Sequence, residues 1–223
     1  MHISPDVLVY WQLGPFTLNG TIVFTWAVMV IMTLGSWLIT RRLTDEVHIS
    51  RWQNLLEAIV SATRQQLDEV VPKQPRGLLP LLGTLFLFIA LSNLLSVVPG
   101  FTPPTGSLST TTALALCVFF AVPFYGILAI GPWNYLGNYV RPSVFMLPFN
   151  IMGELSRTLA LAVRLFGNVM SGHMIGAILL IIAPLLFPVL MQLLGLLTGL
   201  VQAYIFAILA AVYISAGMTV QKK

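Results

Sequence analysis

Charged side chains are scarce in this sequence. Asp, Glu, Lys and Arg make up 8% of the 223 residues, whereas hydrophobic residues make up 57% and the mean hydropathy is +0.91. Soluble domains carry about 25% charged residues, so this composition excludes a soluble domain of this size. The sequence predicts an integral membrane protein.

Cysteine is almost absent as well. The single Cys117 excludes a disulfide framework and a cysteine-rich metal site. There is no HExxH zinc motif, and we expect no cofactor, no metal and no nucleic-acid partner. The net charge of +4 is attributed to membrane topology, because cytoplasmic loops concentrate Lys and Arg. A cleavable signal peptide is not expected, since residues 1–19 lack the Lys or Arg of a positive n-region.

Five long apolar segments are present, and a helix needs about 20 such residues to cross the hydrocarbon core. The segments cover residues 20–40, 78–98, 109–130, 149–183 and 189–221. The last two would be about 52 and 50 Å long against a core of roughly 30 Å, so they must tilt or break. Pro184 and Pro188 favour a turn between them. The sequence therefore predicts a single all-α membrane domain of about five transmembrane helices, ending in a hairpin of two long tilted helices.

The segment 48–71 differs from the apolar segments. Apolar residues recur in it at three- and four-residue steps, while Arg51, Glu57, Arg64, Asp68 and Glu69 exclude burial in lipid. This pattern predicts an amphipathic helix on the cytoplasmic surface of the membrane.

The basic residues predict the orientation. They gather between the first two spans, between the third and fourth, and at the C-terminus, whereas the tail 1–19 and the loop 99–107 have none. Five crossings with the N-terminus outside and the C-terminus in the cytoplasm satisfy the positive-inside rule at every loop. Only Arg157 and Arg164, both in the fourth span, are left unexplained by topology.

Arg164 has no acidic partner within reach in its own chain. A charged side chain at mid-bilayer costs from about 2.5–3.5 to 10–17 kcal/mol on different scales, and usually faces protein or a wet cavity. Glu154 lies three residues before Arg157, which predicts a structural ion pair on one helix face. From Arg164 it is ten residues away, about 15 Å along the axis.

Polar residues form a stripe on each arm of the predicted hairpin. On the fourth span, Arg157, Arg164 and Ser171 are seven apart and Asn168 lies four beyond Arg164, whereas His173 falls on the opposite side. On the last span, Thr198 and Gln202 are four apart. Two such stripes predict an intramembrane ion path. As alternatives, Arg164 could snorkel to an interface, His173 could be a packing residue, and Asn168 and Gln202 could make only interhelical hydrogen bonds.

Several motifs resemble subunit a of the F-type ATP synthases, in the same order and over nearly the whole chain. They are RLFGN at 164–168, ELSRTLALAV at 154–163, LVQAYIFAILAAVYIS at 200–215 and NLLSVVPGFTPPTGSLSTTTALAL at 93–116, with the surface helix between the first spans. The resemblance implies a stator that holds two offset half-channels against a rotating ring of c subunits. It also implies peripheral-stalk b subunits as partners, a bacterial inner membrane as location, and no catalysis by this chain alone.

By the same resemblance, each c subunit presents a carboxylate to Arg164, which matches the essential arginine of the family. Asn168 matches its neighbouring asparagine, Gln202 the last-helix glutamine near that arginine, and His173 a position of the external half-channel. Because Arg stays charged in proteins, Arg164 can attract the carboxylate and block leakage without relaying protons. Ser171 and Thr198 are further candidates for lining a half-channel.

The sequence departs from the family pattern at two places. Gly195 stands where His or Glu usually complements the His173 position. Ser107 and Ser109, which could also line a half-channel, stand where many members carry Asp and Asn. The external half-channel is thus poorer in titratable groups than the family pattern, which counts against proton transfer and makes sodium a serious alternative. Protons remain the first choice for the ion.

Two other classes of protein fit the sequence less well. A self-contained secondary transporter would need an internal acid or a broken helix at mid-membrane, and neither repeats nor spare acids are present. An intramembrane hydrolase would need Ser171 and His173 as a nucleophile–base pair, but residues two apart on a helix point about 200° from each other.

Overall fold

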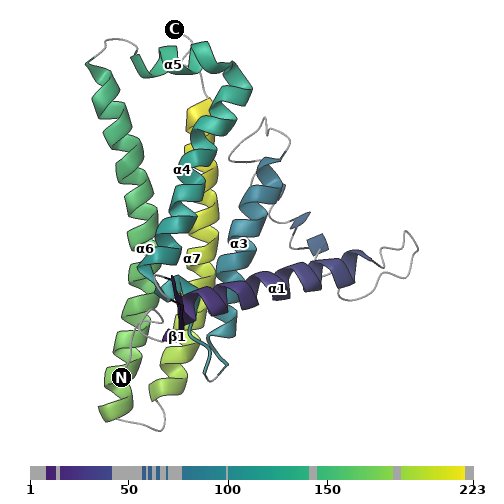
Figure 1. The fold of residues 1–223 in the computed structure, drawn as a ribbon, viewed down its shortest axis with the longest axis vertical. Coiled ribbons are helices and arrows are strands. Elements are labelled where there is room, and N and C mark those ends of the chain that lie inside the picture. The colour runs from purple at the N-terminus through teal and green to yellow at the C-terminus, as the bar shows by residue number, and fades with distance from the viewer. Residues whose placement is uncertain are drawn as a thin grey trace.

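The computed structural model describes residues 9–13, 16–41, 77–98, 100–140, 145–182 and 187–218, with 57–58, 60–61, 64–65 and 69 of the segment between. Five helices in these ranges are long and apolar enough to cross a membrane. They are α1 (Gly20–Thr40), α3 (Leu78–Leu95), α4 (Leu108–Ile130), α6 (Met146–Ile182) and α7 (Phe187–Met218) (Figure 1). This confirms the predicted all-α membrane fold with five spans.

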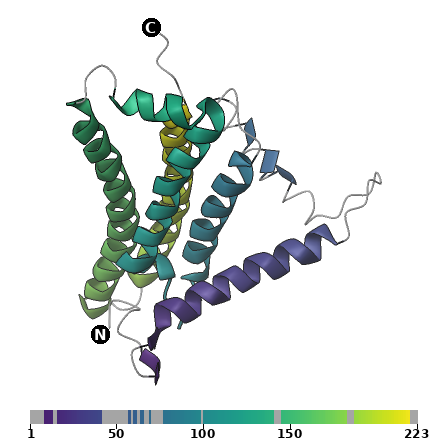
Figure 2. The same cartoon turned by 45° about the horizontal axis from the view of Figure 1, so that its top comes forward.

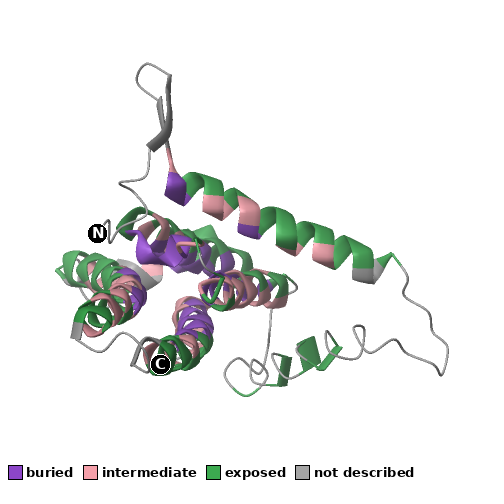
Figure 3. Ribbon diagram, turned by 90° about the horizontal axis from the view of Figure 1, so that it is seen from below, coloured by how far each residue is buried: buried purple, intermediate pink, exposed green. Residues whose placement is uncertain are grey.

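Helices α3, α4, α6 and α7 form a bundle whose buried faces meet along its axis (Figure 3). The α7 face in this core is rich in small residues, with Ala203, Ala210 and Ala211 beside Phe206 and Ile214. Small side chains allow helix backbones to approach closely, which is the main way in which helices associate in lipid. The outer faces of the same helices are apolar and exposed, as a lipid-facing or partner-facing surface requires.

Helix α1 lies apart from this bundle. It slants away, so that only its first half approaches the other helices (Figures 1 and 2). Phe24 packs edge-to-face on Phe101 with ring centroids 5.0 Å apart, and Val28 is fully buried. Further along α1, Leu34, Trp37 and Leu38 are exposed.

Two short elements were not predicted. The expected tail 1–19 contains an antiparallel hairpin of β1 (Val9–Leu13) and β2 (Phe16–Asn19). Helix α5 (Pro132–Val140) crosses the end of the bundle near the C-terminus (Figure 1). Gly131, with φ +82°, ends α4, and Pro132 then starts α5 at a position where a missing N–H costs nothing.

The connection between α3 and α4 is folded into the bundle. Its 3-10 turn, Pro104–Gly106, and the flanking Pro103 and Ser107 are all buried. Backbone bonds from Gly106 N to Pro103 O (2.9 Å) and from Ser107 N to Pro104 O (3.1 Å) satisfy part of this buried chain. Non-helical backbone at such depth is tolerated where it is enclosed by protein or lines a cavity.

The predicted surface helix 48–71 falls largely outside the described residues. Those that are described are helical and exposed, namely Glu57, Ala58, Val60, Ser61, Arg64, Gln65 and Glu69. Pro184, in the predicted turn between the last two spans, also lies outside them, as do most of the basic residues on which the predicted orientation depends. These predictions stay predictions.

Candidate functional site

The α6–α7 hairpin carries most of the predicted site. Helix α6 has 37 residues and α7 has 32, or about 55 and 48 Å, and the two pack against each other as the sequence predicts. Because α6 runs the length of the bundle, residues near its start and its end face opposite ends of the molecule (Figure 1).

Arg164 lies near the middle of α6 on its exposed face. Its neighbours on this face are apolar, and Leu159 and Val163 are 54% and 59% exposed. No hydrogen bond or ion pair of its guanidinium is found within the described part of the chain. The structure thus leaves a permanent cation on the outside of an apolar helix, where lipid cannot solvate it.

A cavity of about 290 Å³ lies toward the end of the bundle where α6 meets α7. We call it the turn-side cavity. Its polar lining consists of Asn93 and Ser96 from α3 and its end, Asn168 and His173 from α6, and Gln192 from α7. Gly195 lines it too, so the position that departs from the family pattern does share a cavity with His173.

Hydrogen bonds fix the amide side chains around this cavity. Asn168 Nδ2 donates to the Thr198 carbonyl at 3.3 Å, which links α6 to α7. Asn93 Nδ2 donates to the Gly199 carbonyl at 3.1 Å, and Thr105 Oγ1 donates to Asn93 Oδ1 at 3.5 Å. Asn93 therefore joins α3 to both the buried turn and α7.

The buried turn also lies against His173. A methyl group at Gly106 would sit 3.4 Å from Val169 and 4.0 Å from His173 Cε1. His173 is half-buried, on the side of α6 away from the exposed Arg164. The imidazole thus forms part of a polar wall rather than of the apolar core.

The predicted hydroxyl residues bond mostly within their own segments. Ser171 Oγ donates to Asn168 O at 3.1 Å, and Thr198 Oγ1 lies 3.0 Å from Leu194 O. Ser107 is buried, and its hydroxyl is 2.9 Å from that of Ser109. The backbone carbonyl of Thr198 accepts the hydrogen bond from Asn168. Ser107 and Ser109 follow the buried turn in the sequence.

Gln202 is buried within α7, 6% exposed, and its Nε2 has no hydrogen-bond partner among the described residues. A buried donor without a partner costs about 1–3 kcal/mol. Such groups call for a specific explanation. One explanation is that the Gln202 amide hydrogen-bonds a water molecule on the path of an ion.

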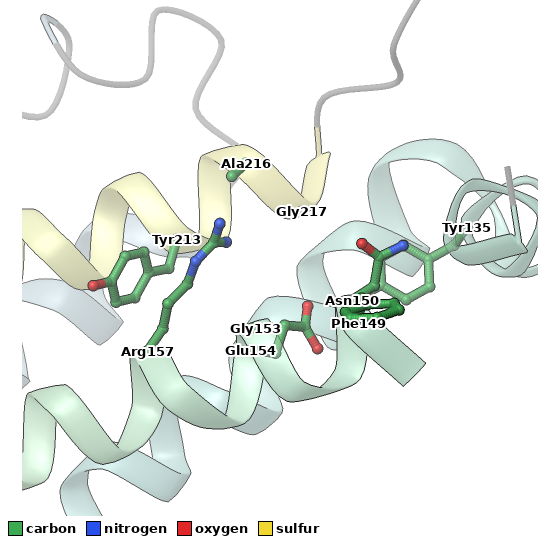
Figure 4. A pocket seen from close by; sticks show the side chains of 9 residues that line it. All are labelled: Tyr135, Phe149, Asn150, Gly153, Glu154, Arg157, Tyr213, Ala216 and Gly217. Carbon is green, nitrogen blue, oxygen red and sulfur yellow. The ribbon is translucent and has the colours of Figure 1, made fainter. Parts of the chain in front are cut away.

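A second cavity, of about 300 Å³, lies at the end of the bundle where α7 ends. We call it the C-terminal cavity, and Figure 4 shows the side chains that line it. Glu154 and Arg157 of α6, Tyr213 of α7 and Tyr135 of α5 supply its ionisable and phenolic groups. The Arg157 guanidinium lies over the Tyr213 ring, 5.6 Å from its centroid.

Figure 4 shows the side chains of Glu154 and Arg157, for which the sequence predicts an ion pair. The Arg157 side chain extends toward α7, whereas the Glu154 carboxylate points toward Phe149 and Asn150. Their ion pair stays a prediction. Tyr213, which spacing along α6 could not link with Arg157, is a neighbour that the structure places over its guanidinium.

The two cavities and Arg164 are ordered along α6. Arg164 is seven residues from Arg157 and nine from His173, or about 10 and 14 Å along the axis. It therefore stands between a cavity that faces one end of the bundle and a cavity that faces the other. Among the described residues no group of three or more His, Cys, Asp or Glu side chains could hold a metal.

Sequence reasoning missed Asn93, Ser96 and Tyr135. Asn93 and Ser96 could have been found, because they are polar residues inside or beside the apolar run of the second span. Tyr135 had no such signal, since its place depends on how α5 folds back on α4 and α7.

Comparison with known proteins identifies relatives over the full chain. The family model of the ATP synthase A chain matches residues 22–215. "ATP synthase subunit a 2" of Acaryochloris marina is 61% identical over 222 residues, covering 100% of this chain and 95% of the relative. "ATP synthase subunit a" of Nitrosospira multiformis is 60% identical over 216 residues, covering 97% and 86%. "ATP synthase subunit a 1" of Chlorobaculum parvum is 61% identical over 223 residues, covering 100% and 99%.

Proposed function

Because the chain belongs to the ATP synthase A chain family, we propose that it is the ion-translocating stator of a rotary F-type ATP synthase. The chain is a membrane subunit of the synthase and not its catalytic part. The identity of the ion, the path that it takes and the role of each residue are parts of this proposal.

The exposed Arg164 is the observation that supports this proposal most directly. An arginine on the outside of an apolar helix needs a negatively charged neighbour from another chain. A ring of c subunits, each with one carboxylate in the membrane, supplies such a neighbour repeatedly as the ring turns. The exposed apolar side chains near Arg164 on α6, such as Leu159 and Val163, suit contact with the apolar helices of that ring.

The two cavities suit the two half-channels of this mechanism. An ion enters through one cavity, binds a ring carboxylate, is carried around by the ring, and leaves through the other. Arg164 stands between the cavities and repels a cation that would pass directly from one to the other. It also attracts each ionised carboxylate as it arrives. The driving energy is about 2.3 kcal/mol per ion for each 100 mV of membrane potential.

Guanidinium chemistry favours arginine for this position. Arg remains protonated even when it is desolvated, whereas the Lys ammonium readily loses its proton in a buried site. A stator cation that titrated would lose its hold on the carboxylate or would relay protons itself. Asn168, tied to α7 through Thr198, holds α6 and α7 together one turn from Arg164.

The orientation follows from the distribution of basic residues. We place the N-terminus outside and the C-terminus in the cytoplasm of a bacterial inner membrane, with the peripheral-stalk b subunits as further partners. The turn-side cavity then opens to the external side and carries His173, while the C-terminal cavity opens to the cytoplasm.

Thiol labelling from the two sides of the membrane tests this arrangement. Cys117 is the only cysteine, so Cys117→Ser gives a cysteine-free chain. In that background we expect Gly172→Cys to react only with a membrane-impermeant reagent on the external side, because Gly172 lines the turn-side cavity. Gly153→Cys, which lines the C-terminal cavity, should react only from the cytoplasmic side.

These two substitutions are a matched pair. Both lie on α6, and a Cβ at either position would meet no atom within 4 Å, so neither side chain is forced out of place. Phe120→Cys, at a position on α4 that is 65% exposed on an apolar face, is the lipid-facing control and should stay unlabelled. Reaction of Gly172→Cys and Gly153→Cys from the same side would contradict the assignment of two half-channels.

The ion is proposed to be the proton, with sodium as the alternative. His173 is the titratable group that the turn-side cavity contains, and its other polar groups are neutral amides and a hydroxyl that suit either ion. We expect ATP-driven pumping by the complex in proteoliposomes to proceed at full rate without sodium and to be abolished by a protonophore. Strict dependence on sodium, with resistance to the protonophore, would favour the sodium-translocating version.

A further inference from the structure

Two consecutive backbone carbonyls of α7 each accept a hydrogen bond from an amide side chain of another helix. The Thr198 carbonyl accepts from Asn168 Nδ2 of α6 at 3.3 Å, and the Gly199 carbonyl accepts from Asn93 Nδ2 of α3 at 3.1 Å. Both bonds come in addition to those that the carbonyls of an α-helix accept from N–H groups four residues on. One turn of α7 is therefore held through its backbone by two other helices at once, and we call residues 198–199 the clamped turn.

The contact of α3 with the clamped turn depends on the residues around Asn93. A Cβ at Gly199 would lie 2.8 Å from Asn93 Cγ, so a glycine is needed for the amide to come this close. On its other side, Asn93 Oδ1 accepts a longer bond of 3.5 Å from Thr105 Oγ1, and both side chains are buried. The buried turn between α3 and α4 thus orients the Asn93 amide so that its N–H groups point at α7.

The clamped turn lies one helical turn from two residues of the proposed ion path. Arg164 comes four residues before Asn168 on α6, and Gln202 comes four residues after Thr198 on α7, which is about 6 Å along each axis. Helices α6 and α7 run in opposite directions (Figure 1), so both steps lead toward the same end of the bundle. Arg164 and the buried Gln202 therefore lie at about the same height along the bundle.

Apolar packing alone gives α7 little reason to keep one height. Lipid tails are as apolar as leucine side chains, so helices in a bilayer gain little by burying such side chains against one another. Next to the clamped turn, Leu197, Leu200 and Val201 of α7 are exposed. Hydrogen bonds to backbone carbonyls are directional, so they fix both the height and the rotation of the helix.

We propose that Asn93 is a positioning residue, which together with Asn168 clamps α7 so that the Gln202 amide stays level with Arg164 during ion transfer. This inference rests on the proposed function, since it concerns a step of ion translocation. Asn93 also lines the turn-side cavity, as a ligand of the ion would. The two roles differ in what a substitution changes, because a ligand sets the affinity for the ion, whereas a positioning residue sets the rate of its transfer.

The test uses the complete ATP synthase in proteoliposomes, with the turn-side cavity facing the lumen and ADP supplied outside. ATP synthesis is driven by an imposed membrane potential while the lumenal concentration of H⁺ or Na⁺, in separate series, is varied. Asn93→Leu is close in size but donates no hydrogen bond. We expect it to lower the maximal rate per assembled complex about three- to tenfold, the effect of about one hydrogen bond. The half-saturating cation concentration should not change.

A double variant separates positioning from a packing defect. If Asn93 acts through Gln202, Asn93→Leu should lower the rate no further once Gln202→Leu has removed the amide that it positions. Two independent defects would instead multiply. Asn134→Leu is the matched control, because Asn134 Nδ2 also donates to a backbone carbonyl, that of Ile130 at 3.1 Å, but only four residues away in the chain. Synthesis should be retained in this variant.

Three results would overturn the inference. They are an unchanged maximal rate in Asn93→Leu, a raised half-saturating concentration in the same variant, and a multiplied loss in the double variant. If Asn93→Leu fails to assemble, Thr105→Val gives the decision, because it keeps its shape and frees the Asn93 amide to turn away from Gly199. It should lower the maximal rate about twofold, and an unchanged rate would contradict the clamp.

Failure of the proposed function looks different from failure of this inference. If the chain were not the ion-translocating stator, the unmodified complex would transport no cation, or Arg164→Ala would synthesise ATP as well as the unmodified complex does. If only the inference is wrong, Arg164→Ala is inactive while Asn93→Leu keeps the full maximal rate or changes the affinity for the cation.

Discussion

ATP synthesis by the reconstituted complex is expected to fall by more than about 100-fold in both Arg164→Ala and Arg164→Lys. Removing one partner of a desolvated ion pair costs about 3–5 kcal/mol, and each 1.36 kcal/mol is tenfold in rate. Because Arg164 lies exposed on α6 and outside the core, neither substitution should disturb the bundle. The complex should therefore assemble normally and fail only in coupled ion flow.

The lysine variant is the more informative of the two. It keeps a basic side chain, so a purely steric or topological role for Arg164 would be preserved. It loses the planar guanidinium and can lose its proton when desolvated. Rates of ATP synthesis driven by an imposed ion gradient, compared with the amount of assembled complex, measure the effect.

Arg41→Gln is the control for loss of a positive charge. Arg41 is an exposed arginine beyond the end of α1, stacked on Trp37 with 4.8 Å to the ring centroid, and it takes no part in the proposed path. Synthesis should be retained in this variant. Full synthesis by an assembled Arg164→Ala complex would refute the stator proposal itself.

Replacement of Gly199 by alanine is expected to destabilise the chain by about 1–3 kcal/mol. A Cβ at this position would lie 2.8 Å from Asn93 Cγ and 2.9 Å from Asn93 Cβ, closer than atoms can approach. The Asn93 side chain, which is 5% exposed, would have to move and give up its bonds to Gly199 O and Thr105. Thermal unfolding in detergent should shift down by roughly 2–12 °C for a chain of this size.

Gly195→Ala is the matched control on the same helix. It lies one turn away on α7, and a Cβ there would meet nothing within 4 Å. Because Ala favours a helix interior over Gly, the unfolding temperature of this variant should stay the same or rise slightly. Equal shifts in the two variants would mean that the contact of α3 with α7 at Asn93 does not depend on a glycine.

The sequence predicts the spans of this chain well because lipid imposes a simple rule. A run of about 20 apolar residues has to become a helix, since its backbone finds no other hydrogen-bond partners in lipid. The five spans therefore lie where the apolar segments are, and the excess length of the last two is visible as the long helices α6 and α7. Arg164 stands out for the same reason, as a charge where lipid tolerates none.

What the sequence could not predict depends on tertiary packing. The connection 99–107 was expected to be an external loop, and loops usually run over the surface, but residues 103–107 are buried among helices. Helix α5 is short and only partly apolar, and its position depends on Tyr135 fitting against Gly126. Spacing on one helix predicts that Glu154 and Arg157 are neighbours, but it carries no information about Tyr213 on another helix.

The place of α1 has a consequence for the order in which the chain is built. Phe24 packs on Phe101, a residue that the ribosome adds only after α3 has been made. Until then the contacts that α1 makes with α3 and with the turn after it in the described part of the chain cannot form, so α1 has to enter the bilayer as an independently inserted segment. Biogenesis of this subunit should therefore pass through a stage in which α1 is already in the membrane but Phe101, on which Phe24 packs in the finished fold, has not yet been made.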